Sequence, residues 1–238
     1  MAPARMSLEA NTAEMELALL LEEVLPFPVR ARGHAAEAGQ AFMDHSYSIP
    51  ATWGEKRCRE FLAGRKAAES ALGAWSARPC EIQRDAEGVP VFPYGFSGSI
   101  THTGSRRTRA FAAVTEGARP IGLDAEEVRT LGMALHSHIV DDDELRVLGS
   151  SPLELDLGVL VAFSAKEAFY KCVYPEHRRF IGFREVSFAY QERQAPHRAR
   201  VFDCQVQHKT LDMGRVGVVL VGQDLVLSFI WNSDRTSA

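Results

Sequence analysis

The segment LGVLVAFSAKEAFYKCVY, residues 157–174, is a long and almost wholly apolar stretch near the middle of the second half of the chain. Its apolar content predicts a buried helix, and Pro175 predicts where that helix stops. Only three side chains within it are charged, namely Lys166, Glu167 and Lys171. An ionised carboxylate among apolar neighbours is costly unless a cation or hydrogen bonds compensate it. The segment therefore predicts a core helix that carries a compensated cluster of charges.

Glu167 and Lys171 are four residues apart, so they share one face of the predicted helix. The ordinary interpretation is an ion pair at the edge of the core, which contributes about 0.2–0.5 kcal/mol on a solvated helix. A functional interpretation requires further charged groups elsewhere in the sequence that meet this face.

A second acidic cluster lies in PIGLDAEEVR, residues 120–129. Asp124 and Glu126 are two residues apart, so on an extended segment both project from the same face. Gly122 would allow another backbone or a ligand to approach closely. A solvated strand end is the simpler interpretation of this pattern. If Glu167 converges with these two side chains, three carboxylates would suit a hard cation, Mg²⁺ or Mn²⁺.

The remaining sequence predicts helices packed on mainly antiparallel strands, an α+β fold. Helices are expected at residues 14–25, at 55–75 and at 141–149, and Thr52 and Glu55 have the spacing of a capping box at the start of the second. Pro and Gly residues separate the strand candidates. These candidates are 81–85, 89–92, 98–102, 107–115, 120–126, 183–191, 198–204, 216–222 and 225–231.

Composition narrows the function classes. The 238 residues suffice for one large or two modest domains, and a formal charge of −4 offers no global positive field for nucleic acid or an anionic membrane. The four cysteines lie far apart in the sequence, so they match neither a C-x-x-C zinc pair nor a disulfide scaffold. This cysteine usage is consistent with a protein of the reducing cytoplasm. No apolar run reaches the roughly 18 residues of a membrane span, and the glutamate-interrupted N-terminus predicts an amphipathic helix rather than a signal peptide.

PIGLDAEE, followed about forty residues later by FSAKEAFYK, resembles the paired signature of the 4'-phosphopantetheinyl transferases, G-[IV]-D-x-E and then [WF]-x-x-K-E-x-x-x-K. KRCREFLAGRKAAESAL at 56–72 and GVPVFPYGFSGSITHTG at 88–104 are similar to segments of the larger, surfactin-type and enterobactin-type members. The resemblance extends from about Lys56 to Lys171. Departures include Phe163 in place of the more frequent Trp.

This resemblance implies a pseudo-dimer, in which one chain folds into two similar α+β subdomains. The subdomains are expected at residues 1–120 and 121–238, and the protein is expected to be a monomer. It places coenzyme A and a metal in the cleft between them. The implied reaction moves the 4'-phosphopantetheine arm from coenzyme A to a serine of an acyl or peptidyl carrier protein and releases adenosine 3',5'-bisphosphate. Members of this group act in siderophore, non-ribosomal peptide, polyketide or fatty-acid synthesis.

The same resemblance assigns roles to individual residues. Asp124, Glu126 and Glu167 become the Mg²⁺ ligands, with Glu167 also the leading candidate for accepting the serine proton. Lys171 is expected to stabilise the pyrophosphate charge, and Lys166 to contact the nucleotide or solvent. The paired N–H donors of an arginine guanidinium group match the oxygens of a phosphate. Basic residues in the N-terminal half of the chain are therefore expected to bind the 3'-phosphate and adenine end of coenzyme A. These are Arg57, Arg65 and His102, and Lys66 of the same helix is also expected to bind coenzyme A.

Two alternatives stay open. The same three carboxylates would serve a metal-dependent nucleotide or coenzyme A hydrolase, with water in place of the carrier serine. A non-catalytic module that binds coenzyme A or a carrier protein is the other. Ser99 with His102 does not predict a serine hydrolase, because a strand-elbow-helix context is missing, and His136 and His138 are interpreted as surface residues.

Overall fold

The computed structural model describes residues 12–37, 47–75, 80–104, 107–194 and 199–233. The chain divides into two compact units, unit 1 (Met1–Ala118) and unit 2 (Arg119–Ala238). Each unit places at least one long helix on an antiparallel sheet, so the predicted α+β class is confirmed. No helix among the described residues is both long enough and apolar enough to cross a membrane.

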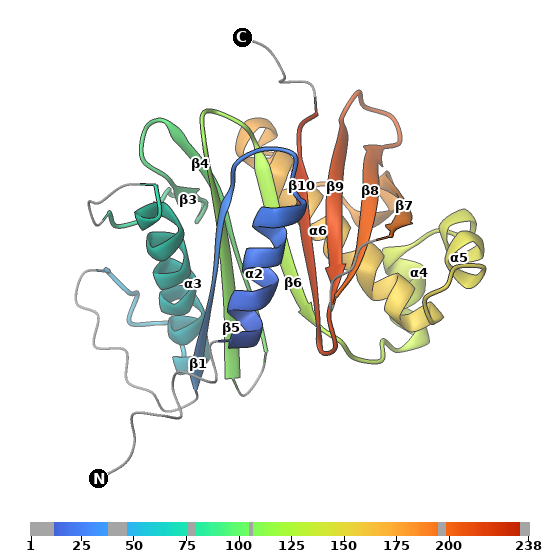
Figure 1. Cartoon of the computed structure of the whole chain (residues 1–238), viewed down its shortest axis with the longest axis horizontal. Helices are drawn as coiled ribbons and strands as arrows, with labels where there is room; N and C mark the ends of the chain where they lie inside the picture. The colour runs from blue at the N-terminus through green and yellow to red at the C-terminus, as the bar shows by residue number, and fades with distance from the viewer. Residues whose placement is uncertain (1–11, 38–46, 76–79, 105–106, 195–198, 234–238) are drawn as a thin grey trace. The chain divides into compact units, whose positions relative to one another are not determined.

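Unit 1 contains a three-stranded antiparallel sheet in the order β1-β5-β4, together with a short β2–β3 hairpin (Figure 1). Its elements are α2 (Thr12–Val24), β1 (Arg30–Glu37), α3 (Glu55–Gly73), β2 (Gln83–Arg84), β3 (Pro90–Val91), β4 (Phe96–Thr103) and β5 (Arg107–Glu116).

The two helices of unit 1 cover opposite faces of this sheet. On one face, Gly33 of β1 lies against Glu14 of α2, and the buried Glu14 carboxylate accepts a hydrogen bond of 2.7 Å from Nε of Arg109. On the other face, Ala110 of β5 packs with Ala63 of α3. Because side chains alternate along a strand, residues 109 and 110 point to opposite faces. The sheet thus holds α3 in a fixed orientation.

Unit 2 is built on a five-stranded antiparallel sheet in the order β6-β10-β9-β8-β7 (Figure 1). Its elements are β6 (Ile121–Glu127), α4 (Met133–Ile139), α5 (Asp142–Gly149), α6 (Leu155–His177), the 3-10 helix η1 (Phe183–Glu185), β7 (Val186–Arg193), β8 (Arg200–His208), β9 (Gly214–Val221) and β10 (Leu225–Trp231).

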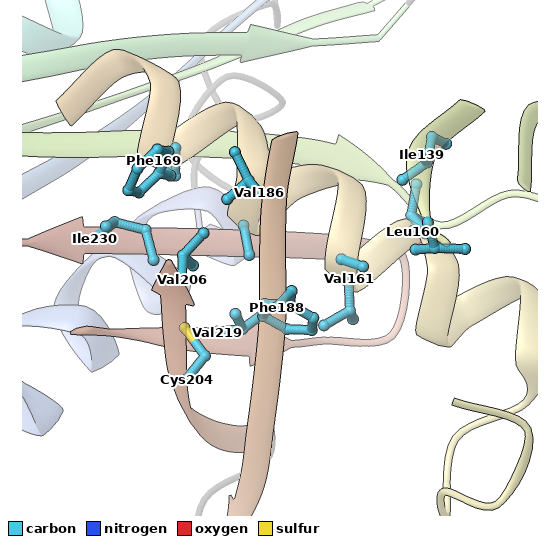
Figure 2. Close-up of a cluster of buried hydrophobic side chains, with 14 of the residues drawn as sticks. Ile139, Leu160, Val161, Phe169, Val186, Phe188, Cys204, Val206, Val219 and Ile230 are labelled. Atoms are coloured by element: carbon cyan, nitrogen blue, oxygen red, sulfur yellow. The ribbon is translucent and has the colours of Figure 1, made fainter. Parts of the chain in front are cut away.

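Helix α6 forms the centre of the unit 2 core. Figure 2 shows part of this core, in which Leu160, Val161 and Phe169 of α6 are buried together with apolar side chains of the strands. Burial of one such side chain contributes about 1.5–3 kcal/mol. The predicted buried helix is therefore confirmed.

Gly122 of β6 lies directly against the backbone of α6. A Cβ atom at this position would be 1.8 Å from the carbonyl oxygen of Ala168 and 2.7 Å from the amide nitrogen of Cys172. The expected close approach of a backbone at Gly122 is thus confirmed. It brings α6 next to the strand that carries the acidic pair.

Three local predictions are wrong. Helix α3 begins after Gly54, which provides no side-chain cap, so Thr52 and Glu55 form no capping box. Pro175 does not stop α6, because a proline in the last turn removes only one backbone hydrogen bond, and the helix ends at His177, where the C-cap Arg178 adopts the left-handed conformation (φ 50°). Helix α4 (Met133–Ile139) lies where the sequence analysis placed no helix.

Candidate active site

The acidic pair of β6 lies on the side of the sheet that α6 covers. Asp124 and Glu126 alternate in step with Gly122, which contacts α6, so all three project toward that helix. Asp124 is 4% exposed, and its Oδ1 is 2.6 Å from the ammonium nitrogen of Lys171. The structure therefore connects the two motifs directly, through an ion pair between the strand and the helix.

Glu167 and Glu126 belong to the same electrostatic cluster. Burial, and then the charge of Asp124, raises the pKa of Glu126 to about 7, while Arg129 and Lys171 oppose the shift. Burial and Asp124 also raise the pKa of Glu167, against the influence of Lys171. Three carboxylates thus share a region with too little positive charge to hold all of them ionised without cost.

A divalent cation would relieve this repulsion. Carboxylate oxygens are the ligands that Mg²⁺ and Mn²⁺ prefer, so the chemistry of the donor set fits these ions. Among the described residues, however, no three His, Cys, Asp or Glu side chains are arranged as a metal centre. In the observed arrangement Lys171 supplies the positive charge that faces Asp124. These side chains would have to change position before three of their oxygens could surround an ion.

A small, mostly apolar pocket lies beside Glu167. Its cavity volume is about 100 Å³, and Tyr170, Phe180, Phe183 and Val186 contribute to its walls. The Phe180 side chain is largely exposed, and its ring lies 6.1 Å from that of Tyr170, centroid to centroid. An aromatic surface of this kind shields an adjacent carboxylate from water.

Lys166 is not where the sequence placed it. Its side chain is 2% exposed, and its ammonium group donates to the carbonyl oxygens of Ile139 and Phe183 and to the carboxylate of Glu144. An ammonium group has three donors, and all three are used. The prediction that Lys166 contacts the nucleotide or solvent is therefore wrong for this structure.

In unit 1, α3 and β4 bring two of the predicted basic residues together. Nη1 of Arg57 lies 3.5 Å from Nε2 of His102, and Glu60 is within 4 Å of both side chains. The Arg57 guanidinium also lies over the Trp53 ring, 5.1 Å from its centroid. These groups form a basic surface next to an aromatic side chain.

Arg65 lies deeper on the same side of α3. It is 5% exposed, its guanidinium lies 4.6 Å from the centroid of Phe61, and burial lowers its pKa to about 10. Its Nε is buried and has no hydrogen-bond partner among the described residues. A buried donor without a partner is costly, and an anion that reached it would relieve that cost.

Arg84 of β2 joins this cluster, although no pattern in the sequence selects it. Its guanidinium lies 4.5 Å from the Trp53 centroid and 5.7 Å from that of Phe61, and its charge helps to lower the pKa of Arg65. Three arginines thus surround two aromatic rings. We call Arg57, Arg65 and Arg84 the guanidinium cluster.

Lys66 lies apart from the guanidinium cluster. It is nine residues after Arg57, which places it on the opposite side of α3. Its charge instead acts on His34 of β1, whose pKa is lowered first by burial and then by Lys66. The structure thus separates Lys66 from the three residues with which the sequence grouped it.

The histidine pair of α4 is also placed differently from the prediction. His136 is buried, and its Nε2 lies 3.0 Å from Asp156 of α6, so it is a packing contact between two helices rather than a surface residue. His138 is exposed, as expected. The sequence could not reveal this difference, because α4 itself was not predicted.

Comparison with known proteins identifies both units. Residues 47–115 match the 4'-phosphopantetheinyl transferase N-terminal domain, and residues 120–229 match the 4'-phosphopantetheinyl transferase superfamily. The 4'-phosphopantetheinyl transferase Npt of Nocardia iowensis is 32% identical over 169 residues, which is 71% of each chain.

Two further relatives align over shorter stretches. Enterobactin synthase component D of Salmonella typhimurium (strain LT2) is 38% identical over 120 residues, covering 50% of this chain and 49% of its own. The 4'-phosphopantetheinyl transferase PptT of Mycobacterium tuberculosis (strain H37Rv) is 29% identical over 137 residues, covering 57% and 60%. Together with the matches in both units, these similarities show that the chain belongs to the 4'-phosphopantetheinyl transferase superfamily.

Proposed function

We propose that this protein transfers the 4'-phosphopantetheine arm of coenzyme A to a serine hydroxyl of an acyl or peptidyl carrier protein, in a reaction that depends on Mg²⁺. The observation that carries the proposal is the partly buried cluster in which Lys171 contacts Asp124 while Glu126 and Glu167 are electrostatically coupled to both. Membership of the superfamily supports the same reaction.

The serine oxygen would form a new bond to the phosphorus that bears the pantetheine arm. The bond from that phosphorus to the bridging oxygen would break, and adenosine 3',5'-bisphosphate would leave with the electron pair. Glu167 is our candidate for the group that accepts the serine proton. Charge stabilisation and positioning supply most of the catalysis in phosphoryl transfer, and Lys171 provides a cation for the pyrophosphate.

Asp124, Glu126 and Glu167 would hold the Mg²⁺, or Mn²⁺, in this proposal. When bound, the ion neutralises negative charge on the pyrophosphate oxygens as a Lewis acid. Lys171 already contacts Asp124, so it lies near the phosphates that this site would bind.

The guanidinium cluster and His102 are our candidates for binding the 3'-phosphate end of coenzyme A. Forked guanidinium donors match phosphate oxygens, and the buried Nε of Arg65 supports such a contact. Lys66 is omitted because it lies on the other side of α3, and Lys166 because its donors are used within unit 2.

A cytoplasmic enzyme fits the free cysteines of the described residues, Cys58, Cys80, Cys172 and Cys204. We propose that its carrier protein belongs to a siderophore, non-ribosomal peptide, polyketide or fatty-acid pathway. The relative named enterobactin synthase component D makes siderophore carriers the first to test.

Intact-mass analysis tests the proposal directly. A panel of apo carrier proteins is incubated with coenzyme A, Mg²⁺ and this protein, and at least one carrier should gain the mass of a phosphopantetheine arm. EDTA should stop the reaction, and added Mg²⁺ should restore it. Cleavage of coenzyme A without any carrier would instead indicate a hydrolase, and binding of coenzyme A without cleavage or transfer would indicate a non-catalytic module.

A further inference from the structure

The ion pair between Lys166 and Glu144 is the most deeply buried charged contact in unit 2 that the proposed chemistry does not use. The Lys166 ammonium lies 2.8 Å from both carboxylate oxygens of Glu144, and the two residues are 2% and 8% exposed. It also donates to the carbonyl oxygens of Ile139 at 2.9 Å and Phe183 at 3.1 Å. One side chain of α6 therefore holds the last residue of α4 and the first residue of η1.

Glu144 extends this network to two more elements. Its Oε2 accepts a hydrogen bond of 3.0 Å from the amide of Asp141, which is the N-cap of α5, and its Oε1 accepts one of 2.8 Å from the amide of Phe188 in β7. Both buried charges are thus fully hydrogen-bonded. Such a pair fixes geometry more than it adds stability, since the cost of desolvation offsets the attraction.

The network lies directly beside the candidate active site. Lys166 precedes Glu167 in α6, and the pocket next to Glu167 is lined by Lys166, Phe183 and Gly182. Phe183 also packs against Phe163 of α6, with ring centroids 5.3 Å apart. The bond from Lys166 to the Phe183 carbonyl therefore ties one wall residue of this pocket to α6.

We infer that Lys166 is a positioning residue that contacts no substrate: by tying α4 and η1 to α6, it fixes the pocket wall against which Glu167 is held. Its effect on catalysis rests on the proposed function, whereas its effect on η1 does not. The ordering of Phe183–Glu185 can thus be measured even in a protein with no transfer activity.

The experiment compares the double variant Lys166→Met/Glu144→Gln with the wild-type protein. Removing both charges avoids an unpaired buried ion, which would unfold the single variants. Lys209→Met is the matched control, because it removes a lysine contact of 2.6 Å to Asp141 at the exposed edge of the same network but leaves the contacts of Lys166 intact. Hydrogen–deuterium exchange, coenzyme A binding by calorimetry, and transfer kinetics on folded protein are the measurements.

In the double variant, peptides that contain Phe183–Glu185 should exchange at least about ten times faster, while peptides from β9 and β10 keep their rates. Coenzyme A binding should change by less than about threefold, and kcat should fall by at least about tenfold. Lys209→Met should change none of these values.

Three results would overturn the inference. Unchanged exchange at Phe183–Glu185 would show that Lys166 does not hold η1. A coenzyme A dissociation constant raised more than about tenfold, with a weaker dependence on salt, would show that Lys166 binds phosphate directly. An unchanged kcat with faster exchange at η1 would reduce Lys166 to a structural residue. Absence of transfer by the wild-type protein would refute the proposed function alone.

Discussion

Replacing Gly122 by Ala should separate the two halves of the acidic cluster. The new Cβ would lie 1.8 Å from the carbonyl oxygen of Ala168, and ordinary contact begins at 3.4 Å, so strand β6 and helix α6 would need to separate by a further 1.6 Å. Backbone atoms cannot rotate away as a flexible side chain can. The Lys171–Asp124 contact of 2.6 Å spans this same interface and would lengthen with it.

The expected loss of stability in Gly122→Ala follows from the cost of overpacking. Insertion of a methyl group into a close-packed core costs about 1–3 kcal/mol, and a clash between backbones lies at the upper end of that range. A loss of about 3 kcal/mol corresponds to a fall in Tm of about 6–12 °C for a chain of this size. Transfer activity should fall by at least about 100-fold in protein that is still folded, because phosphoryl transfer depends on exact placement of charges.

Thermal denaturation by circular dichroism and the intact-mass transfer assay check this prediction. Gly132→Ala is the control, because a Cβ there meets no atom within 4 Å and its φ of −63° suits any residue. This control should keep the wild-type Tm and activity. A Gly122→Ala protein with wild-type stability and turnover would refute the argument that the close approach of α6 to β6 builds the site.

Three other changes probe the charges of the two candidate sites. Asp124→Asn should abolish transfer and lower the pKa of Glu126 from about 7, because the charge of Asp124 helps to raise that pKa. An unchanged pKa of Glu126 in a carboxyl NMR titration of the variant would contradict this prediction. The raised pKa of Glu126 means that the folded state binds its proton more tightly than the unfolded state, so the free energy of unfolding should decline as pH rises from about 4.5 to 7. In Glu126→Gln that decline should be smaller in urea unfolding, and an identical decline would exclude Glu126 as its source. In calorimetry, Arg84→Ala should weaken the binding of coenzyme A at least about tenfold and leave the binding of 3'-dephospho-coenzyme A unchanged. The control Arg30→Ala removes an arginine stacked on Trp75 and should change the binding of neither ligand. If Arg84→Ala weakened the binding of both ligands equally, Arg84 would not belong to the phosphate site.

The wrong assignments of Lys166 and His136, and the failure to select Arg84, share a cause in tertiary contacts. Periodicity showed that Lys166 lies about 100° from Glu167 around the helix, but not that α4 and η1 would supply three acceptors for it. Arg84 carries no pattern in the sequence, and only the β2–β3 hairpin brings it over Trp53. His136 became buried because an unpredicted helix packs it against Asp156.

The amino-acid sequence alone predicts the two acidic motifs, the core helix and the alternating strands, because residue spacing shows which side chains share a face and which faces are apolar. It also indicated through Gly122 that a backbone would approach β6. Tertiary structure decided which of the charges meet. Lys171 faces Asp124, whereas the neighbouring Lys166 turns into the core, and the difference is the partner that the folded chain presents to each ammonium group. A buried charged side chain lies where a compensating partner is within reach, and the fold determines which residues distant in sequence supply that partner.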